Sequence, residues 1–128
     1  MADAHELPQG QAARRQRVLL AAMDLAETGG YDAVQMREVA TEAGVALGTI
    51  YRYFSSKDHL LAAALVEWAL DLERRVSARP PRGDTTADRM VDILSRATRA
   101  MERRPELAAA LITALSRPDP AVAQCQEE

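Results

Sequence analysis

The residues best suited to bind another molecule lie close together between positions 44 and 54. Apolar side chains recur there at i, i+3, i+4 and i+7, the spacing of one helical face: Leu47, Ile50, Tyr51 and Phe54. The opposite face is expected to present four residues: Gly48, Thr49, Arg52 and Tyr53. Thr49 can contact a thymine methyl group or phosphate, Arg52 phosphate or guanine, and Tyr53 phosphate. Gly48 would let a second surface approach the helix backbone closely.

A second short helix is expected just before this one, over residues 35–43. Val39 and Ala40 form its apolar pair, and Gly44 follows as a signal that ends a helix. Val45 is apolar enough to anchor the turn to a core. Two short helices joined by about three residues with a glycine form the helix-turn-helix pattern. The alternative at this point is a small helical core with an ordinary polar face.

Four further basic residues stand at expected helix starts: Arg14, Arg15, Arg37 and Lys57. A cation at the N-terminus of a helix opposes the helix dipole by a few tenths of a kcal/mol. An external anion such as phosphate would relieve that cost. The alternatives are a solvated helix start for Arg14 and Arg15, and pairing of Arg37 with Glu38 or Thr41.

The run GVALGTIYRYFSSKDHL, from Gly44 to Leu60, resembles the signature of TetR-family transcriptional regulators. That signature combines a glycine-hydrophobic turn, a recognition helix with the pattern glycine-Thr-hydrophobic-Tyr, a Tyr-Phe pair and a lysine that opens the fourth helix. The match runs without a gap from about residue 15 to 65, and residues 36–68 also resemble KstR-type regulators of sterol and lipid catabolism in actinobacteria. Many family members have a serine cap where this chain has Ala46. The recognition helix is therefore expected to take a cap from elsewhere or to lack one.

The resemblance implies that the recognition helix, Leu47–Tyr53, enters the major groove of double-stranded DNA. It places DNA contacts at ten positions: Arg14, Arg15, Arg37, Leu47, Gly48, Thr49, Tyr51, Arg52, Tyr53 and Lys57. It also implies a homodimer on a palindromic operator, whose half-sites lie about one helical turn, ~34–36 Å, or a multiple of it apart. Repression is the commoner output of the family, and activation stays open.

Composition and charge bound the remaining possibilities. The chain has 128 residues, about one domain, with 48% hydrophobic residues and few aromatic ones, which predicts an aliphatic, alanine-rich helical core. Its net charge of −3 argues mildly against nucleic-acid binding, although phosphate contact depends on local charge. No apolar run reaches the ~20 residues that span a bilayer, and Met1–Gly10 lacks the apolar part of a secretory signal. The single cysteine, Cys125, cannot form an internal disulfide, so a cytoplasmic location is expected.

Catalysis has little support in the sequence. His59 stands beside Asp58, but neither a nucleophile nor metal-ligand spacing accompanies the pair. We therefore interpret His59 as a surface or partly packed residue and expect neither enzymatic activity nor a cofactor or metal. Ser55 is expected to cap the following helix, with Asp58 three residues later.

The rest of the chain predicts an all-α fold. A long helix is expected over residues 57–78, and it would link the two halves mechanically. A break with paired prolines follows at 79–84, and Thr85 and Pro105 each start a further helix. We expect a disordered terminus at 1–11, a three-helix DNA-binding domain at 12–56, and at 57–128 the first part of a helical ligand-binding and dimerisation domain. The family's regulatory domain normally continues for several more helices, so truncation is expected.

Seven apolar residues are candidates for lining an effector pocket: Leu65, Trp68, Met90, Ile93, Met101, Leu107 and Leu111. Any single one of them could equally be ordinary bundle core. The resemblance to KstR-type regulators implies a bulky lipid-derived effector, a sterol metabolite or its coenzyme A thioester. The rival interpretation is a helical protein-interaction module that keeps the helix-turn-helix shape without binding DNA, and the acidic balance is its main support.

Overall fold

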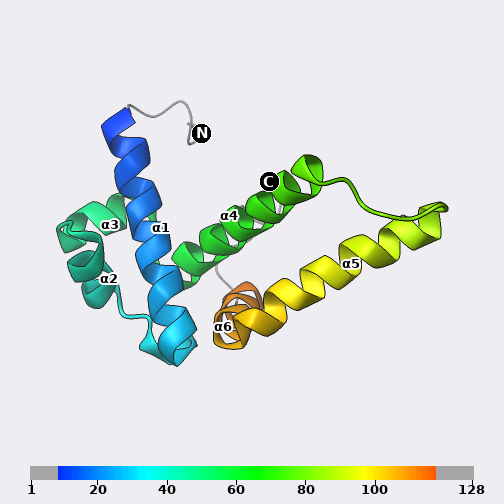
Figure 1. Ribbon diagram of the computed structural model, residues 1–128. Coiled ribbons are helices and arrows are strands. Elements are labelled where there is room, and N and C mark those ends of the chain that lie inside the picture. Colours follow the sequence, from blue (N-terminus) through cyan, green and yellow to red (C-terminus); the bar gives the residue numbers. More distant parts are fainter. Residues whose placement is uncertain (1–8, 118–128) are drawn as a thin grey trace.

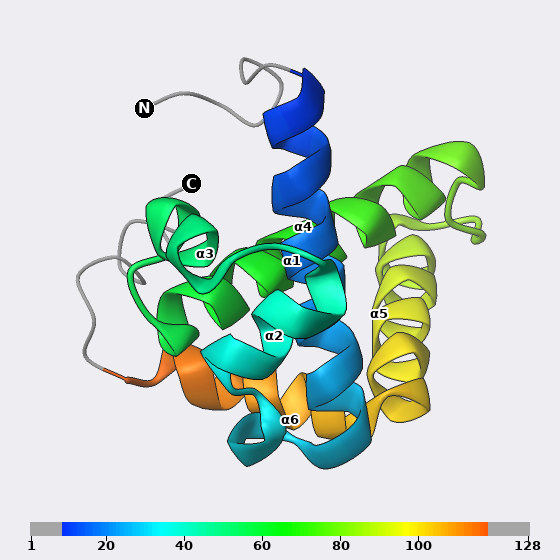
Figure 2. The same ribbon diagram turned by 90° about the vertical axis from the view of Figure 1, so that its left-hand side faces the viewer.

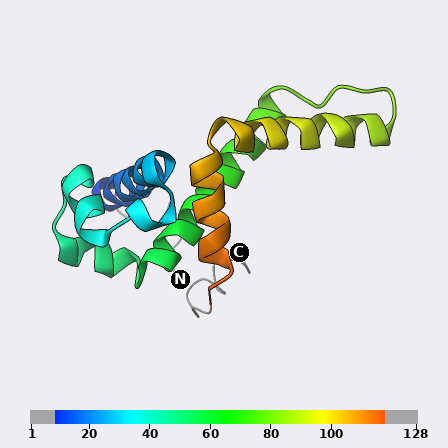
Figure 3. The same cartoon turned by 90° about the horizontal axis from the view of Figure 1, so that it is seen from below.

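The computed structural model describes residues 9–117, in which helices joined by short loops are the regular structure and no strand occurs. From the N-terminal to the C-terminal side, the elements are α1 (Gln9–Gly29), the 3-10 turn η2 (Tyr31–Ala33), α2 (Met36–Ala43), α3 (Leu47–Tyr53), α4 (Lys57–Ala78), α5 (Thr86–Arg103) and α6 (Pro105–Leu115). Helices α1, α2 and α3 gather at one end, and α4 leads away from them (Figure 1). The far half of α4 and most of α5 extend to one side of this cluster (Figure 3).

One aliphatic core holds α1, α2, α3, the start of α4 and α6 together. Its largest fully buried side chains come from all five helices and the segments that join them: Val18, Leu19, Val34, Val39, Ile50, Phe54, Leu60, Leu61, Leu107 and Leu111. Alanines of α1, α2, α4 and α6 fill the space between them, as the composition predicted. Because α6 packs in this core beside α1, the buried cluster continues across the boundary expected at residues 56 and 57.

Glycine and capping side chains set the helix boundaries. Gly30 ends α1 with φ 78°, and its amide donates to the Ala26 carbonyl at 2.7 Å. The Thr85 hydroxyl accepts from the Asp88 amide at 3.1 Å, so the cap expected for α5 is confirmed. The expected helix at 57–78 has the observed bounds of α4. Helix α1, however, begins at Gln9 and includes Gly10, whereas the sequence predicted a start at residue 12.

Side chains of α5 secure the loop between α4 and α5. The Arg96 guanidinium donates to the carbonyls of Arg79 at 2.6 Å and Pro80 at 3.1 Å, and it pairs with Asp92 at 2.7 Å. The Arg82 amide donates to the same Asp92 carboxylate and lowers the pKa of that group. This network holds the proline-rich loop against the first turns of α5.

Helix α5 has an apolar face that the described part of the chain leaves open. None of its residues is buried, and Met90, Val91 and Leu94 expose 57%, 62% and 62% of their surface. Among residues 9–117, no helix combines the length and the apolar character that crossing a membrane requires. Cys125 and the tail from Ala121 lie outside the described residues.

Candidate nucleic-acid interface

The turn between α2 and α3 has the geometry that the glycine predicted. Gly44 adopts the left-handed conformation, with φ 71° and ψ 37°, and its amide donates to the Thr41 carbonyl. The next amide, of Val45, reaches back to the Ala40 carbonyl at 3.0 Å, the long bond of a Schellman motif. Val45 itself packs against the core. The helix-turn-helix predicted from residues 36–54 is therefore confirmed, and α2 and α3 face the same side of the molecule (Figure 2).

Two fully buried residues fix the orientation of α3. Ile50 lies at the centre of the helix with no exposed surface, and Phe54 follows its last residue with 1% exposed. Leu47 and Tyr53 are half-buried against the same core. As expected for Ala46, the start of α3 has no side-chain cap.

The exposed stripe of α3 consists of Gly48, Tyr51 and Arg52, one turn apart along the helix. This corrects one part of the sequence prediction. Tyr51 was placed on the apolar face, but half of its surface is exposed (51%), whereas Tyr53 packs inward and Thr49 is half-buried. The reason is that Phe54 lies beyond the helix in an extended conformation, with φ −136° and ψ 122°. Counting it on the helical wheel rotated the predicted face toward Tyr51.

Basic residues of α1 and α2 stand in the same helical cluster as α3. The Arg15 guanidinium lies 5.3 Å from the centre of the Phe54 ring, which fixes the early part of α1 beside the end of α3. Because α1 begins at Gln9, Arg14 and Arg15 lie in its second turn, and the predicted conflict with the helix dipole falls away there. Arg37 is exposed at the start of α2 and, among residues 9–117, forms no ion pair with Glu38 or another acid.

Lys57 has partners within the molecule. Its Nζ lies 3.8 Å from the centre of the Tyr31 ring, and burial lowers the pKa of the amine, against the opposing charges of Asp32 and Asp58. From the sequence, an external anion was the only partner predicted for Lys57. The structure instead turns its side chain onto η2, so its contact with phosphate stays a prediction.

Around Lys57 a polar cluster joins η2, α4 and the end of α6. The Tyr31 hydroxyl donates to Asp58 Oδ1 at 2.5 Å, and Arg117 Nε donates to Asp58 Oδ2 at 3.1 Å. Burial and the adjacent Asp58 carboxylate raise the pKa of Tyr31 to about 12, because a phenolate there would face a second negative charge. The sequence did not reveal this cluster, since its three members lie 27 and 59 residues apart.

The cap of α4 also differs from the prediction. Ser56, and not Ser55, accepts from the His59 amide at 3.0 Å, while the Ser55 amide donates to His59 Nδ1 at 3.0 Å. The His59 ring also meets Phe54 edge-on at 5.4 Å. The His59 ring therefore satisfies the amide one residue before the N-cap, a variant of the capping box, in whose usual form the N3 side chain accepts from the N-cap amide itself. Within residues 9–117 no group of three potential metal-ligating side chains occurs.

The candidate effector residues separate into three groups. Leu65, Trp68 and Met101 line an apolar groove of about 160 Å³ between α4, α5 and α6, together with Ile112. Leu107 and Leu111 were expected there too, but both are fully buried in the core, because α6 turns them toward α1 and α4. Met90 and Ile93 lie earlier on α5 and do not line the groove. Sequence periodicity could not separate groove from core, because both are apolar.

Comparison with known proteins agrees with this helix-turn-helix geometry. Residues 18–64 match the family described as bacterial regulatory proteins, tetR family, and residues 83–127 match the tetracyclin repressor-like C-terminal domain. A structure described as a member of the TetR family from Streptomyces coelicolor A3 superposes with a TM-score of 0.65 at 30% identity, covering 92% of this chain and 69% of that one. The chain belongs to the TetR family. The sequence resemblance is thereby confirmed.

Within the TetR family, the chain is similar to KstR proteins. It is 49% identical over 114 residues to the HTH-type transcriptional repressor KstR of Rhodococcus jostii (strain RHA1), covering 88% of this chain and 52% of the relative. The crystal structure of a TetR transcriptional regulator from Rhodococcus sp. RHA1 superposes with a TM-score of 0.76 at 38% identity, over 94% of this chain and 65% of that one. The chain spans about half the length of the curated relatives it matches.

Proposed function

We propose that this chain acts as a TetR-type transcriptional repressor that binds a palindromic operator as a homodimer through α3. The observation that carries the proposal is the exposed stripe of Gly48, Tyr51 and Arg52 on a short helix seated by buried Ile50. A rigid seat matters because base readout requires the helix to enter the groove in one orientation. In this proposal the chain works in the cytoplasm and is not an enzyme.

Each exposed group of α3 has a role in the proposed complex. Arg52 can bind phosphate or the guanine edge, and the Tyr51 hydroxyl can bind phosphate. Gly48 has open space around its position, since no other atom of residues 9–117 outside its own helix turn lies within 4 Å of where a Cβ would be, and so it lets DNA come close. Arg37 of α2, with Arg14 and Arg15 of α1, would contact the flanking backbone. Two-fold symmetry then requires half-sites ~34–36 Å, or a multiple, apart.

An effector would act through α4. Helix α4 has 22 residues, hence a length of ~33 Å, and it runs from the end of α3 to the apolar groove lined by Leu65, Trp68 and Met101. A hydrophobic ligand that spreads this groove would tilt α4 and move α3 with it. A coupling of roughly 1–3 kcal/mol suffices to release DNA. From the likeness to KstR proteins we propose a lipid- or sterol-derived ligand, as such or as its coenzyme A thioester, and control of lipid-catabolism genes.

A helical protein-interaction module is the second candidate, and one observation favours it. The apolar face of α5, with Met90, Val91 and Leu94, is open in the described part of the chain. Such a face suits another helix. If the chain is such a module, its binding to a partner protein does not depend on DNA.

The deciding experiment is a selection from a pool of random-sequence duplexes, with the bound fraction sequenced, at about 50 and about 200 mM salt. The proposal predicts an enriched sequence with two-fold symmetry, and its loss in Arg52→Ala but not in the control Arg99→Ala, which changes an exposed arginine of α5. No enrichment would contradict the proposal and leave the interaction module.

A further inference from the structure

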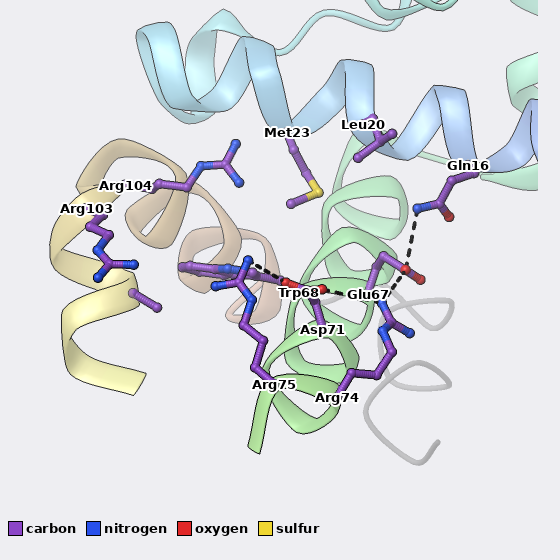
Figure 4. Close-up of a pocket in the computed structure, with 11 residues that line it drawn as sticks. Gln16, Leu20, Met23, Glu67, Trp68, Asp71, Arg74, Arg75, Arg103 and Arg104 are labelled. Atoms are coloured by element: carbon purple, nitrogen blue, oxygen red, sulfur yellow. Dashed lines mark hydrogen bonds and ion pairs between the residues drawn. The ribbon is translucent and has the colours of Figure 1, made fainter. Parts of the chain in front are cut away.

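A cleft of about 380 Å³ lies between α1, α4 and the junction of α5 with α6, apart from α3 and from most of the apolar groove. Gln16, Leu20 and Met23 line it from α1, and Trp68 lines it from α4 (Figure 4). This volume lies within the range of small-ligand sites. The cleft therefore spans the joint between the helix-turn-helix and the rest of the chain.

Arginines dominate the charge of the cleft. Four arginines but only two carboxylates line it: Arg74, Arg75, Arg103 and Arg104, with Glu67 and Asp71. The two carboxylates already pair with Arg74, at 3.5 and 3.7 Å, and with Arg75, at 2.9 Å. Neither of these carboxylates forms an ion pair with Arg103 or Arg104, which lie on the other side of the cleft. The surplus positive charge therefore belongs to the α5–α6 junction.

Arg104 has a donor that the described chain does not satisfy. Its Nη2 pairs with Glu27 at 2.6 Å, but its buried Nε has no acceptor among residues 9–117. Arg103 forms no ion pair with any carboxylate in that range. Figure 4 shows the Arg104 side chain extending toward α1 and Met23, with Trp68 below. Because the Arg104 Nε is closed off from solvent, an anion in the cleft would bind the accessible guanidinium nitrogens of Arg103 and Arg104.

We infer that this cleft binds a small organic anion, a carboxylate with an apolar body. Arg103 and Arg104 hold the carboxylate, and the body lies along Trp68, Leu20 and Met23. The ligand would bridge α1 and α4, and so stabilise one position of the helix-turn-helix against the long helix. This site differs from the apolar groove, whose lining contains no charged residue.

The single tryptophan makes the inference testable, because Trp68 is the only one in the chain and lines the cleft. Its fluorescence would be titrated with decanoate, with the neutral isostere decanamide and with inorganic phosphate. We expect decanoate to bind about tenfold more tightly than decanamide, the gain of charge-assisted hydrogen bonds. Phosphate should bind at least tenfold more weakly than decanoate, because it lacks the apolar body.

Variants separate the cleft from the groove. The double variant Arg103→Gln/Arg104→Gln should bind both decanoate and decanamide equally, whereas Arg99→Gln, one turn earlier on α5, should keep the tenfold preference. Arg103→Gln alone leaves the Glu27 pair in place and should lower the preference to about threefold. Decanoate should also raise the thermal unfolding midpoint of the wild type more than that of the double variant.

Several outcomes would overturn the inference. If the wild type binds decanoate and decanamide equally, both bind in the apolar groove. If it binds neither, the cleft is not a site for such ligands. If the double variant keeps the preference for decanoate over decanamide, the carboxylate binds at another site. If phosphate binds as tightly as decanoate, the site does not recognise an apolar body. None of these readouts depends on DNA, so the test is independent of the proposed function.

Discussion

Replacing Tyr31 by Phe removes one hydroxyl from the cluster that joins η2, α4 and α6. That hydroxyl donates to Asp58 at 2.5 Å, and a hydrogen bond to a charged group contributes about 1.5–3 kcal/mol. Asp58 keeps its pair with Arg117, so the carboxylate is not left alone. We therefore expect Tyr31→Phe to lower the free energy of unfolding at neutral pH by about 1.5 kcal/mol, the lower end of that range.

The pH dependence of this difference follows from the raised pKa of Tyr31. Folding raises it from an ordinary value of 10.0 to about 12, so the folded chain holds the phenolic proton more tightly than the unfolded one. That stability is fully present below about pH 10 and is lost as the pH rises toward about 12. The loss amounts to about 0.4 kcal/mol near pH 10 and about 1.4 kcal/mol near pH 11, as upper values for a half-buried ring. Tyr31→Phe lacks this loss.

Urea unfolding followed by circular dichroism, from about pH 8 to about pH 11, measures both effects. The stability gap between wild type and Tyr31→Phe should narrow by at most about 1.4 kcal/mol over that range, because the titration of Lys57 is common to both chains and nearly cancels. Tyrosinate absorbance should show one late-titrating tyrosine that disappears in the variant. Parallel stability curves, or three tyrosines that titrate together, would refute the contact between Tyr31 and Asp58.

Four substitutions test other parts of the structure by urea unfolding. Gly44→Ala should lower the free energy of unfolding by about 1 kcal/mol, since a φ of 71° disfavours a Cβ although space is open around it. An unchanged unfolding midpoint would contradict the left-handed conformation of Gly44. Gly48→Ala should instead stabilise α3 by about 0.5–1 kcal/mol while weakening DNA binding in anisotropy titrations, and tighter binding would contradict a close DNA approach. Ser56→Ala should cost about 1 kcal/mol, with Ser55→Ala as the milder control; the reverse order would restore the cap predicted from sequence. Leu111→Ala should cost about 2–5 kcal/mol, and a cost below 1 kcal/mol would place Leu111 in the groove and outside the core.

Local rules predicted the features that depend on neighbours in sequence. Gly44 ended α2 because its conformation suits a glycine, and paired prolines ended α4 because they cannot continue a helix. The predicted apolar face of α3 was wrong because it counted Phe54 as part of the helix. The helix ends one residue earlier, and the Phe54 side chain reaches the core from an extended backbone. Choosing Ser55 as the cap failed for a similar reason, because either serine satisfies the pattern and packing decides between them.

Contacts across the fold could not be predicted in this way. Tyr31, Asp58 and Arg117 meet only because α6 returns beside η2 and the start of α4. The same return buries Leu107 and Leu111, while Trp68 stays at the edge of both the groove and the arginine-lined cleft. Apolar spacing predicted which residues leave water but not which neighbours they meet.

The central claim, that α2 and α3 present a DNA-binding surface, is tested most directly by the salt dependence of binding. Fluorescence-anisotropy titrations of a duplex would be run from about 50 to about 200 mM salt with wild type and with Arg37→Ala/Arg52→Ala. Each phosphate contact contributes about 0.9 to the slope of log affinity against log salt, so the slope should fall by about 0.9 through the loss of Arg37, and by about 1.8 where Arg52 contacts phosphate and not guanine. An Arg99→Ala control should keep the wild-type slope. If the double variant keeps it as well, the surface formed by α2 and α3 does not contact DNA.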